Sequence, residues 1–155
     1  MNQPDEASIR AAVIVGILRY TQMPLAADAE VIRLCSVGAP YSQDKLSQVS
    51  VSLRVQGYSL DFSVIPESNL TTQRLQACDV LIVGKEYEPS EQTLTAYSGL
   101  SICDGCNQFI PVYVVELIKA DKRIGFNVNL DQANRFDVNL SSSLLELASK
   151  IRRSK

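Results

Sequence analysis

The chain of 155 residues contains no histidine and no tryptophan. Without histidine it lacks the usual proton shuttle near neutral pH, the base of the familiar serine triads and the commonest metal ligand. No glycine-rich pattern of the dinucleotide-binding or P-loop kind is present, so the common phosphate cradles are also missing. Catalysis would have to rest on aspartate, glutamate, lysine, tyrosine or cysteine. We therefore expect a binding protein that is not an enzyme and holds no cofactor.

The sequence also lacks a long hydrophobic run. The longest, from Ala11 to Leu18, is far shorter than the roughly 20 apolar residues of a membrane span. We therefore expect no direct insertion into a membrane. Residues 2–8 are polar and do not read as a signal peptide, although a mature exported protein behind an added Met1 would look the same. Residues alone leave a cytoplasmic and an exported origin open.

Strong charge of either sign is absent. The net charge is −2, with 21% charged and 46% hydrophobic residues, which gives no electrostatic reason to expect a nucleic acid partner. A chain of this length buries roughly 70% of its unfolded surface when it folds, enough for one true core. We expect a single domain over residues 1–155.

The four cysteines fall into two kinds. Cys103 and Cys106 form a close pair, whereas Cys35 and Cys78 each stand alone inside an apolar run. A zinc site made of cysteines usually needs two close pairs, so zinc is disfavoured. An even number of cysteines suits two disulfides in an oxidising compartment, while buried thiols beside a chance C-x-x-C remain the alternative.

The segment Cys103-Asp104-Gly105-Cys106 is the chemical motif that needs most care. In a redox enzyme, C-x-x-C opens a helix whose N-terminal amides lower the pKa of one thiol. Here Gly105, Asn107 and Pro111 follow, and they start a helix poorly. We favour a loop cross-link, with a thiol–disulfide oxidoreductase as an alternative. Asp104, like Asp79, lies near the end of an expected strand and is interpreted as a turn or capping carboxylate.

The first two-thirds of the chain alternates strands and helices. A first helix is expected over residues 5–20, and Gly57 is expected to cap a later helix of about 42–55. This rhythm predicts an α/β fold with a mainly parallel sheet, built from β-α-β units and flanked by helices. The other expected strands are 31–37, 59–65, 80–83 and 100–103, and the other helices are 70–75 and Ser90 to Tyr97. The apolar stripe of the first helix is Ile9, Ala12, Val13, Gly16, Ile17 and Tyr20.

After Pro111 the rhythm changes. Two strand-like runs, 112–119 and 123–130, are joined by three residues, which predicts an antiparallel hairpin. A polar connector then leads to a closing helix expected over about 142–151. Its buried stripe is expected to be Leu144, Leu147, Ala148 and Ile151.

Several stretches of this chain carry a family resemblance. The C-terminal stretches IGFNVN, LDQANRFDVN and SSLLELA resemble the YfiR family, which closes a strand on F-x-[IV]-N-L and ends in an S-x-x-L-L-x-L-A helix. The N-terminal stretch IVGILRYTQMP is similar to that family's opening helix, G-I-x-x-Y-T followed by W-P. The matching positions are Phe126, Val128, Asn129, Leu130, Ala133, Leu144, Leu145, Leu147 and Ala148.

The resemblance implies a periplasmic protein that represses a YfiN-type inner-membrane diguanylate cyclase by binding the cyclase's periplasmic domain. A YfiB-type, OmpA-like outer-membrane lipoprotein would relieve the repression by sequestering the repressor. The resemblance also implies a homodimer and redox-sensitive disulfides, with Cys35 paired to Cys78.

Two positions depart from the family pattern. Met23 stands where the family has an aromatic residue before the proline, and the family's second disulfide joins cysteines farther apart than Cys103 and Cys106. A small-ligand binding module and a redox protein remain the alternative functions. The residues expected to contact a partner are Met23, Glu116, Arg135, Phe136 and Asp137.

Overall fold

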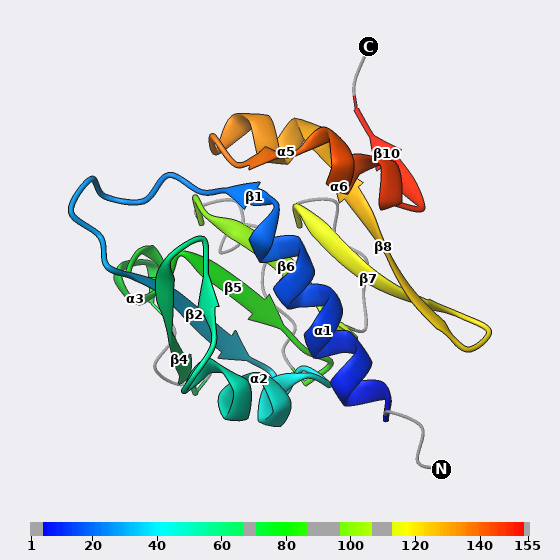
Figure 1. The fold of residues 1–155 in the computed structure, drawn as a ribbon, viewed down its shortest axis with the longest axis horizontal. Helices are drawn as coiled ribbons and strands as arrows, with labels where there is room; N and C mark the ends of the chain where they lie inside the picture. The colour runs from blue at the N-terminus through cyan, green and yellow to red at the C-terminus, as the bar shows by residue number, and fades with distance from the viewer. Residues whose placement is uncertain (1–4, 67–70, 87–96, 107–112, 154–155) are drawn as a thin grey trace.

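The computed structural model describes residues 5–66, 71–86, 97–106 and 113–153 (Figure 1). The helix expected from Ser90 to Tyr97 lies outside these ranges except for Tyr97 itself, and so does the first position of the strand expected at 112–119. Within the described ranges, no helix has the length and apolar character needed to cross a membrane.

The first helix, α1 (Glu6–Arg19), begins at a carboxylate cap. The Asp5 side chain accepts a hydrogen bond from the Ser8 amide at 2.8 Å, which satisfies one of the unpaired N–H groups of the first turn. Glu6 and Arg19 lie at the ends where their charges complement the helix dipole. The expected helix of residues 5–20 is therefore confirmed to within one residue at each end.

The buried face of α1 was predicted wrongly in part. Ala12 and Tyr20, both placed in the buried stripe, are exposed. Residues 11–18 are apolar on every side of the helix, so periodicity alone does not select the face that meets the sheet. Packing selects it. The residues that α1 buries are Arg10, Ala11, Ile14, Ile17 and Leu18.

The main sheet has eight strands in the order β10-β8-β7-β6-β5-β2-β4-β3. Neighbouring strands from β4 to β7 are parallel, which confirms the predicted mainly parallel α/β fold. The helices α2 and α3 lie between the early strands in sequence. The bounds are β2 (Val31–Val37), α2 (Gln43–Ser50), β4 (Tyr58–Val64), α3 (Thr72–Gln76), β5 (Val80–Val83), β6 (Leu100–Cys103) and β7 (Val115–Ala120).

The C-terminal hairpin also forms as predicted. Strand β7 pairs with β8 (Arg123–Asn129) antiparallel, and the tight turn between them places Asp121 at a φ of 57°. Aspartate tolerates this left-handed conformation better than most residues because its side chain can hydrogen-bond locally.

The closing helix was predicted too long. Helix α6 (Ser142–Leu147) stops early, Ala148 is extended, and β10 (Lys150–Arg152) pairs parallel with β8. Ile151 lies opposite Val128 in that strand rather than on a helix, and Leu147 is 71% exposed rather than buried. The edge of β8 offers backbone hydrogen bonds that a helix continued to residue 151 would leave unpaired.

Gly57 has a different role from the one expected. Helix α2 ends at Ser50, and Gly57 lies in the turn between β3 (Arg54–Val55) and β4. Gln56 and Gly57 have φ values of 53° and 85°, the combination that a tight two-residue hairpin turn requires. Gly57 does adopt the left-handed conformation that was expected, but in a hairpin turn and not at the end of a helix.

The two faces of the sheet bury separate apolar clusters. On one face, α1 and α2 cover the strands and fill the main core, which includes Ile14, Leu34 and Leu46 at no measurable exposure (Figure 1). On the other face, Leu75 of α3 packs in a second cluster together with the alternate strand residues Cys35 and Val83. The sheet is therefore buried on both sides along its central strands.

Candidate functional site

A short second sheet brings the end of α1 to the polar connector. Strand β1 (Thr21–Gln22) pairs antiparallel with β9 (Asn139–Leu140), and the Ser141 amide donates to the Tyr20 carbonyl at 3.0 Å. Because Met23 directly follows β1 and Val138 directly precedes β9, this pairing places two predicted contact segments side by side. We call this region, residues 19–23, 56 and 135–141, the β1–β9 surface.

The connector itself contains a helix that the sequence reading missed. Helix α5 (Leu130–Arg135) starts at Asn129, whose side chain accepts from the Gln132 amide at 3.3 Å. It ends with Asp137 in the left-handed conformation, at a φ of 58°, and the Val138 amide donates back to the Ala133 carbonyl at 2.9 Å. This is a left-handed helix ending that normally favours glycine or asparagine.

Four of the predicted contact residues lie on the β1–β9 surface. Met23 and Phe136 are partly buried and pack against the main core, whereas Arg135 and Asp137 are exposed. The Arg135 guanidinium carbon lies 5.3 Å from the centre of the Phe136 ring, a cation–π distance. The surface thus combines anchored apolar side chains with exposed charges of both signs.

Two further residues shape this surface and were not predicted. Tyr20 is 54% exposed at the end of α1. Gln56 donates its side-chain amide to the carbonyls of Leu18 at 2.9 Å and Thr21 at 2.8 Å. A hollow of about 440 Å³ lies here, lined by Arg19, Tyr20, Gln22, Gln56, Asn139, Leu140 and Ser141.

Glu116 lies apart from the other predicted contact residues. Its neighbours Val115 and Leu117 point into the main core under α1, so Glu116 projects from the opposite face of the sheet. There it accepts a hydrogen bond from the Asn127 side chain at 3.3 Å. The five predicted residues therefore form two sites, not one.

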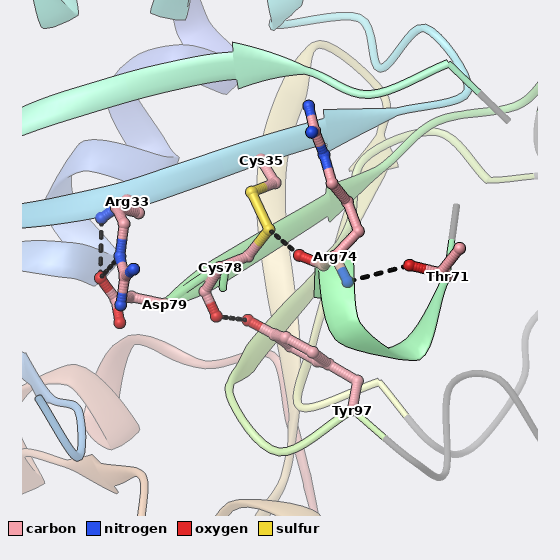
Figure 2. Close-up of a disulfide and its surroundings, with 7 residues drawn as sticks. All are labelled: Arg33, Cys35, Thr71, Arg74, Cys78, Asp79 and Tyr97. Carbon is pink, nitrogen blue, oxygen red and sulfur yellow. Dashed lines mark hydrogen bonds and ion pairs between the residues drawn. A yellow bond between two sulfur atoms is a disulfide. The ribbon is translucent and has the colours of Figure 1, made fainter. Parts of the chain in front are cut away.

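The structure pairs Cys35 with Cys78, whose Cα atoms are 5.8 Å apart (Figure 2). The bridge links β2 to Cys78, which lies between α3 and β5, inside the second apolar cluster. The Tyr97 hydroxyl donates to the Cys78 carbonyl at 3.0 Å, and burial, helped by the Asp79 carboxylate, raises the pKa of that phenol. The dashed contact from the Cys78 sulfur to the Arg74 carbonyl is a close approach only, because a disulfide sulfur carries no hydrogen to donate.

Asp79 anchors the same neighbourhood. Its carboxylate accepts from the Arg33 amide at 2.8 Å and from the Arg33 guanidinium at 3.4 Å. Both contacts reach across to β2, so Asp79 links two distant segments, whereas the sequence predicted a local turn or capping carboxylate.

The second pairing, Cys103 with Cys106, has a Cα separation of 5.6 Å at the carboxyl end of β6. Cys103 is the last residue of that strand, and Gly105 bends the chain with a φ of 87°, so the described residues of the motif do not open a helix. The amide dipoles that activate a redox thiol are therefore not provided by residues 103–106.

Asp104, between these cysteines, is the most buried charged group of the described chain, with 0% exposure. One carboxylate oxygen accepts from the Arg10 guanidinium at 2.8 Å, and the other accepts from the Ser42 amide at 2.9 Å and from its hydroxyl. The network joins α1, the start of α2 and the end of β6. Asp104 thus joins three elements through long-range contacts, whereas the sequence predicted a local turn or capping carboxylate.

Within the described ranges, no group of three or more histidine, cysteine, aspartate or glutamate side chains is placed to hold a metal ion. The described chain forms an α/β domain that is cross-linked at two positions and has a hollow beside the β1–β9 pairing.

Comparison with known proteins identifies the family. A family model described as YfiR/HmsC-like matches residues 7–149, and the chain belongs to this family. It is a family of periplasmic regulatory proteins linked to diguanylate cyclase signalling. A search of curated proteins found no significant match.

Proposed function

We propose that this protein represses an inner-membrane diguanylate cyclase by binding the cyclase's periplasmic domain through the β1–β9 surface. The observation that carries the proposal is the family match over residues 7–149, which spans nearly the whole described fold. The surface is supported by the β1–β9 pairing, which brings Met23, directly after β1, beside the end of the segment that carries Arg135, Phe136 and Asp137. It is also supported by the hollow that Tyr20, Gln56 and Leu140 line next to this pairing.

The β1–β9 surface has the composition of a protein contact site. Phe136 and Met23 are held by the main core, so their exposed parts lose little freedom when a partner covers them. Arg135 and Tyr20, exposed beside them, are residue types that often dominate binding free energy. A partner that fills the hollow would bury Tyr20, and one that also covers the adjoining residues 135–137 would bury Arg135.

Regulation follows from competition between partners. A YfiB-type, OmpA-like lipoprotein of the outer membrane sequesters the repressor and thereby releases the cyclase by mass action. No catalytic step is needed. We further propose that the repressor is a homodimer, which sedimentation of the oxidised protein at micromolar concentration tests directly; a monomer there contradicts it.

The binding proposal is tested with the purified periplasmic domain of a YfiN-type diguanylate cyclase. We expect capture of that domain by the wild type, and at least about tenfold weaker capture by Arg135→Glu. Arg123→Glu, at the exposed start of β8, is the matched control and should bind normally. Equal binding by Arg135→Glu and Arg123→Glu would move the contact away from the β1–β9 surface.

Competition is tested in the same assay. The soluble domain of a YfiB-type lipoprotein should displace the bound cyclase domain from the wild type. If both proteins bind the repressor at once without displacement, sequestration is excluded as the release mechanism.

Redox state is a second proposed control. Reduction of Cys35–Cys78 would lower the conformational stability of the repressor and so its ability to hold the cyclase. Peptide mapping of the periplasmic protein without reductant should find this pair joined; finding both thiols free would contradict redox control.

A further inference from the structure

A cavity of about 410 Å³ lies on the sheet face opposite α1, beside the last strand β10. Its wall is made by the polar residues Glu116, Asn127, Lys150 and Arg152, and its apolar part includes Tyr113 and Val128. The volume falls in the range of small-ligand sites, which are typically about 300 to 1,000 Å³. We call it the β8–β10 cavity.

Strand register sets the polar residues in a row. Glu116 pairs with Asn127 across β7 and β8, and Asn127 pairs with Lys150 across β8 and β10. Neighbouring strands are about 4.8 Å apart, so the backbones of Glu116 and Lys150 are separated by roughly 10 Å. Arg152, two residues after Lys150, points to the same face and adds a second cation at that end.

The charges along this row do not neutralise one another. The ion pairs among the described residues join Arg10 to Glu6 and Asp104, Arg33 to Asp79, and Lys119 to Glu6. Glu116, Lys150 and Arg152 are in none of them, although all three line one cavity. A carboxylate therefore stands at one end of the row, and two cations stand at the other.

Asn127, at the centre of the row, has an unused acceptor. Its side-chain nitrogen donates to Glu116 at 3.3 Å, while its side-chain oxygen is buried and accepts no hydrogen bond. A buried acceptor without a donor is unfavourable and is normally satisfied by a neighbouring group. The end of the cavity near Glu116 therefore favours a group that carries N–H donors and positive charge.

We propose that the β8–β10 cavity binds a small zwitterion whose ammonium and carboxylate groups are several bonds apart. The ammonium donates to the Glu116 carboxylate and to the side-chain amide oxygen of Asn127. The ligand carboxylate reaches Lys150 and Arg152. The hydrocarbon between them lies against Tyr113. The wide spacing of the protein charges favours an ω-amino carboxylate over an α-amino acid, in which the two charges are adjacent. This proposal does not depend on the partner-binding function.

The test compares three probes of similar length by isothermal titration calorimetry on the full chain at low salt. The probes are ε-aminocaproate, which has both charges, caproate, which has only the anion, and hexylamine, which has only the cation. We expect ε-aminocaproate to bind at least about tenfold more tightly than either single-charge probe, because only it satisfies both ends of the row. Glycine should bind more weakly than ε-aminocaproate.

Variants assign each end of the ligand. Glu116→Gln should remove the advantage of ε-aminocaproate over caproate, and Arg152→Gln should remove its advantage over hexylamine. Glu30→Gln and Arg123→Gln, exposed residues outside the cavity, are the matched controls and should bind as the wild type does. The melting temperature of each variant shows whether it folds.

Amide NMR shifts of the wild type give a readout that needs no variant. Titration with ε-aminocaproate should move the signals of Asn127, Asn129 and Lys150 most. The proposal is overturned if no probe binds at millimolar concentration, if the three probes bind alike, or if the shifts cluster away from β8 and β10.

Discussion

The two cystine pairings of this domain act on very different lengths of chain. Cys35 and Cys78 are 43 residues apart in sequence and join strand β2 to the connection that leads into β5, inside an apolar cluster. Cys103 and Cys106 are three residues apart and close a small loop at the end of β6. In the chain-entropy description, the first bond stabilises the fold by roughly 4 kcal/mol and the second by about 2 kcal/mol.

The two cross-links therefore contribute in different ways, because each constrains a different part of the chain. The long link limits the conformations of a large part of the unfolded chain. In the folded protein it lies on the sheet face that has the smaller apolar cluster. The short link restricts little of the unfolded chain, but it fixes the loop that presents Asp104 to Arg10 and Ser42. One pairing supports the whole fold, and the other positions a single buried carboxylate.

The largest expected effect comes from the carboxylate inside the short loop. Arg10 is only 5% exposed, and Asp104→Ala removes its most buried partner. Because this leaves a buried charge without that partner, the free energy of unfolding should fall by about 3 to 5 kcal/mol. Urea denaturation of the oxidised protein measures it. Asp61→Ala, at an exposed position of β4, is the control and should change stability little. A small loss for Asp104→Ala would mean that the network does not hold α1.

Removing the long link should have the next largest effect. The double variant Cys35→Ala, Cys78→Ala is expected to lose roughly 3 to 4 kcal/mol, mainly because its unfolded state gains conformational freedom. The same denaturation experiment, run with and without reductant, measures it. Reductant should destabilise the wild type by more than it destabilises this double variant, and equal losses would contradict the assignment of the long link.

Removing the short link should cost about 2 kcal/mol. If its main role is to position Asp104, combining Cys103→Ala, Cys106→Ala with Asp104→Ala should destabilise by clearly less than the sum of the separate losses. Additive losses would show that the loop and the carboxylate act independently.

A smaller effect is expected at Tyr97, beside the long link. Tyr97→Phe removes the hydrogen bond to the Cys78 carbonyl and should cost about 1 kcal/mol. Thermal unfolding followed by circular dichroism measures the change. Tyr58→Phe provides a tyrosine comparison on β4, and a Tyr97→Phe protein as stable as the wild type would show that the buried hydroxyl contributes nothing.

The smallest effect concerns pH at the start of α1. The hydrogen bond from Lys119 lowers the pKa of Glu6, and the Ser8 side chain and amide lower the pKa of Asp5. A lowered folded-state pKa gives stability that is present above the unfolded value, near pH 4, and is lost as pH falls through the folded value. The free energy of unfolding should therefore decline below about pH 4. The decline should be shallower in Glu6→Gln than in the control Glu30→Gln.

Most of the strands were predictable because burial on both faces leaves a plain signature. The runs 31–37, 80–83 and 100–103 are almost wholly apolar and end at glycine, aspartate or cysteine turns, and the structure reproduces their bounds. The hairpin of β7 and β8 was equally clear, because a connection of a few residues leaves an antiparallel pair as the simple solution.

What failed were the features decided by distant parts of the chain. Ile151 fits a helical stripe, yet the open edge of β8 converts it to a strand. Helix α5 has six residues, too few for a periodic pattern to show, and its Asn129 cap was hidden in an apparent strand end. Arg10 and Asp104 are 94 residues apart, and nothing local to either predicts their contact.

The candidate site was predicted only in outline. The polar connector suggested Arg135 to Asp137, the family resemblance drew attention to Met23, and the β1–β9 pairing brings the two segments side by side. Glu116, on the adjoining hairpin, was expected to belong to the same surface. Only the three-dimensional register shows that it projects from the other face.

The Gln56 side chain has a consequence for how this domain opens. By holding the Leu18 and Thr21 carbonyls, it ties the β3–β4 turn to the end of α1, and the β1–β9 pairing ties that end to residues 139–141. Segments tied in this way tend to exchange their amide hydrogens as one cooperative unit, with a single opening free energy. A partner seated on any part of that unit would slow deuterium uptake in all of it, including amides that the partner never touches.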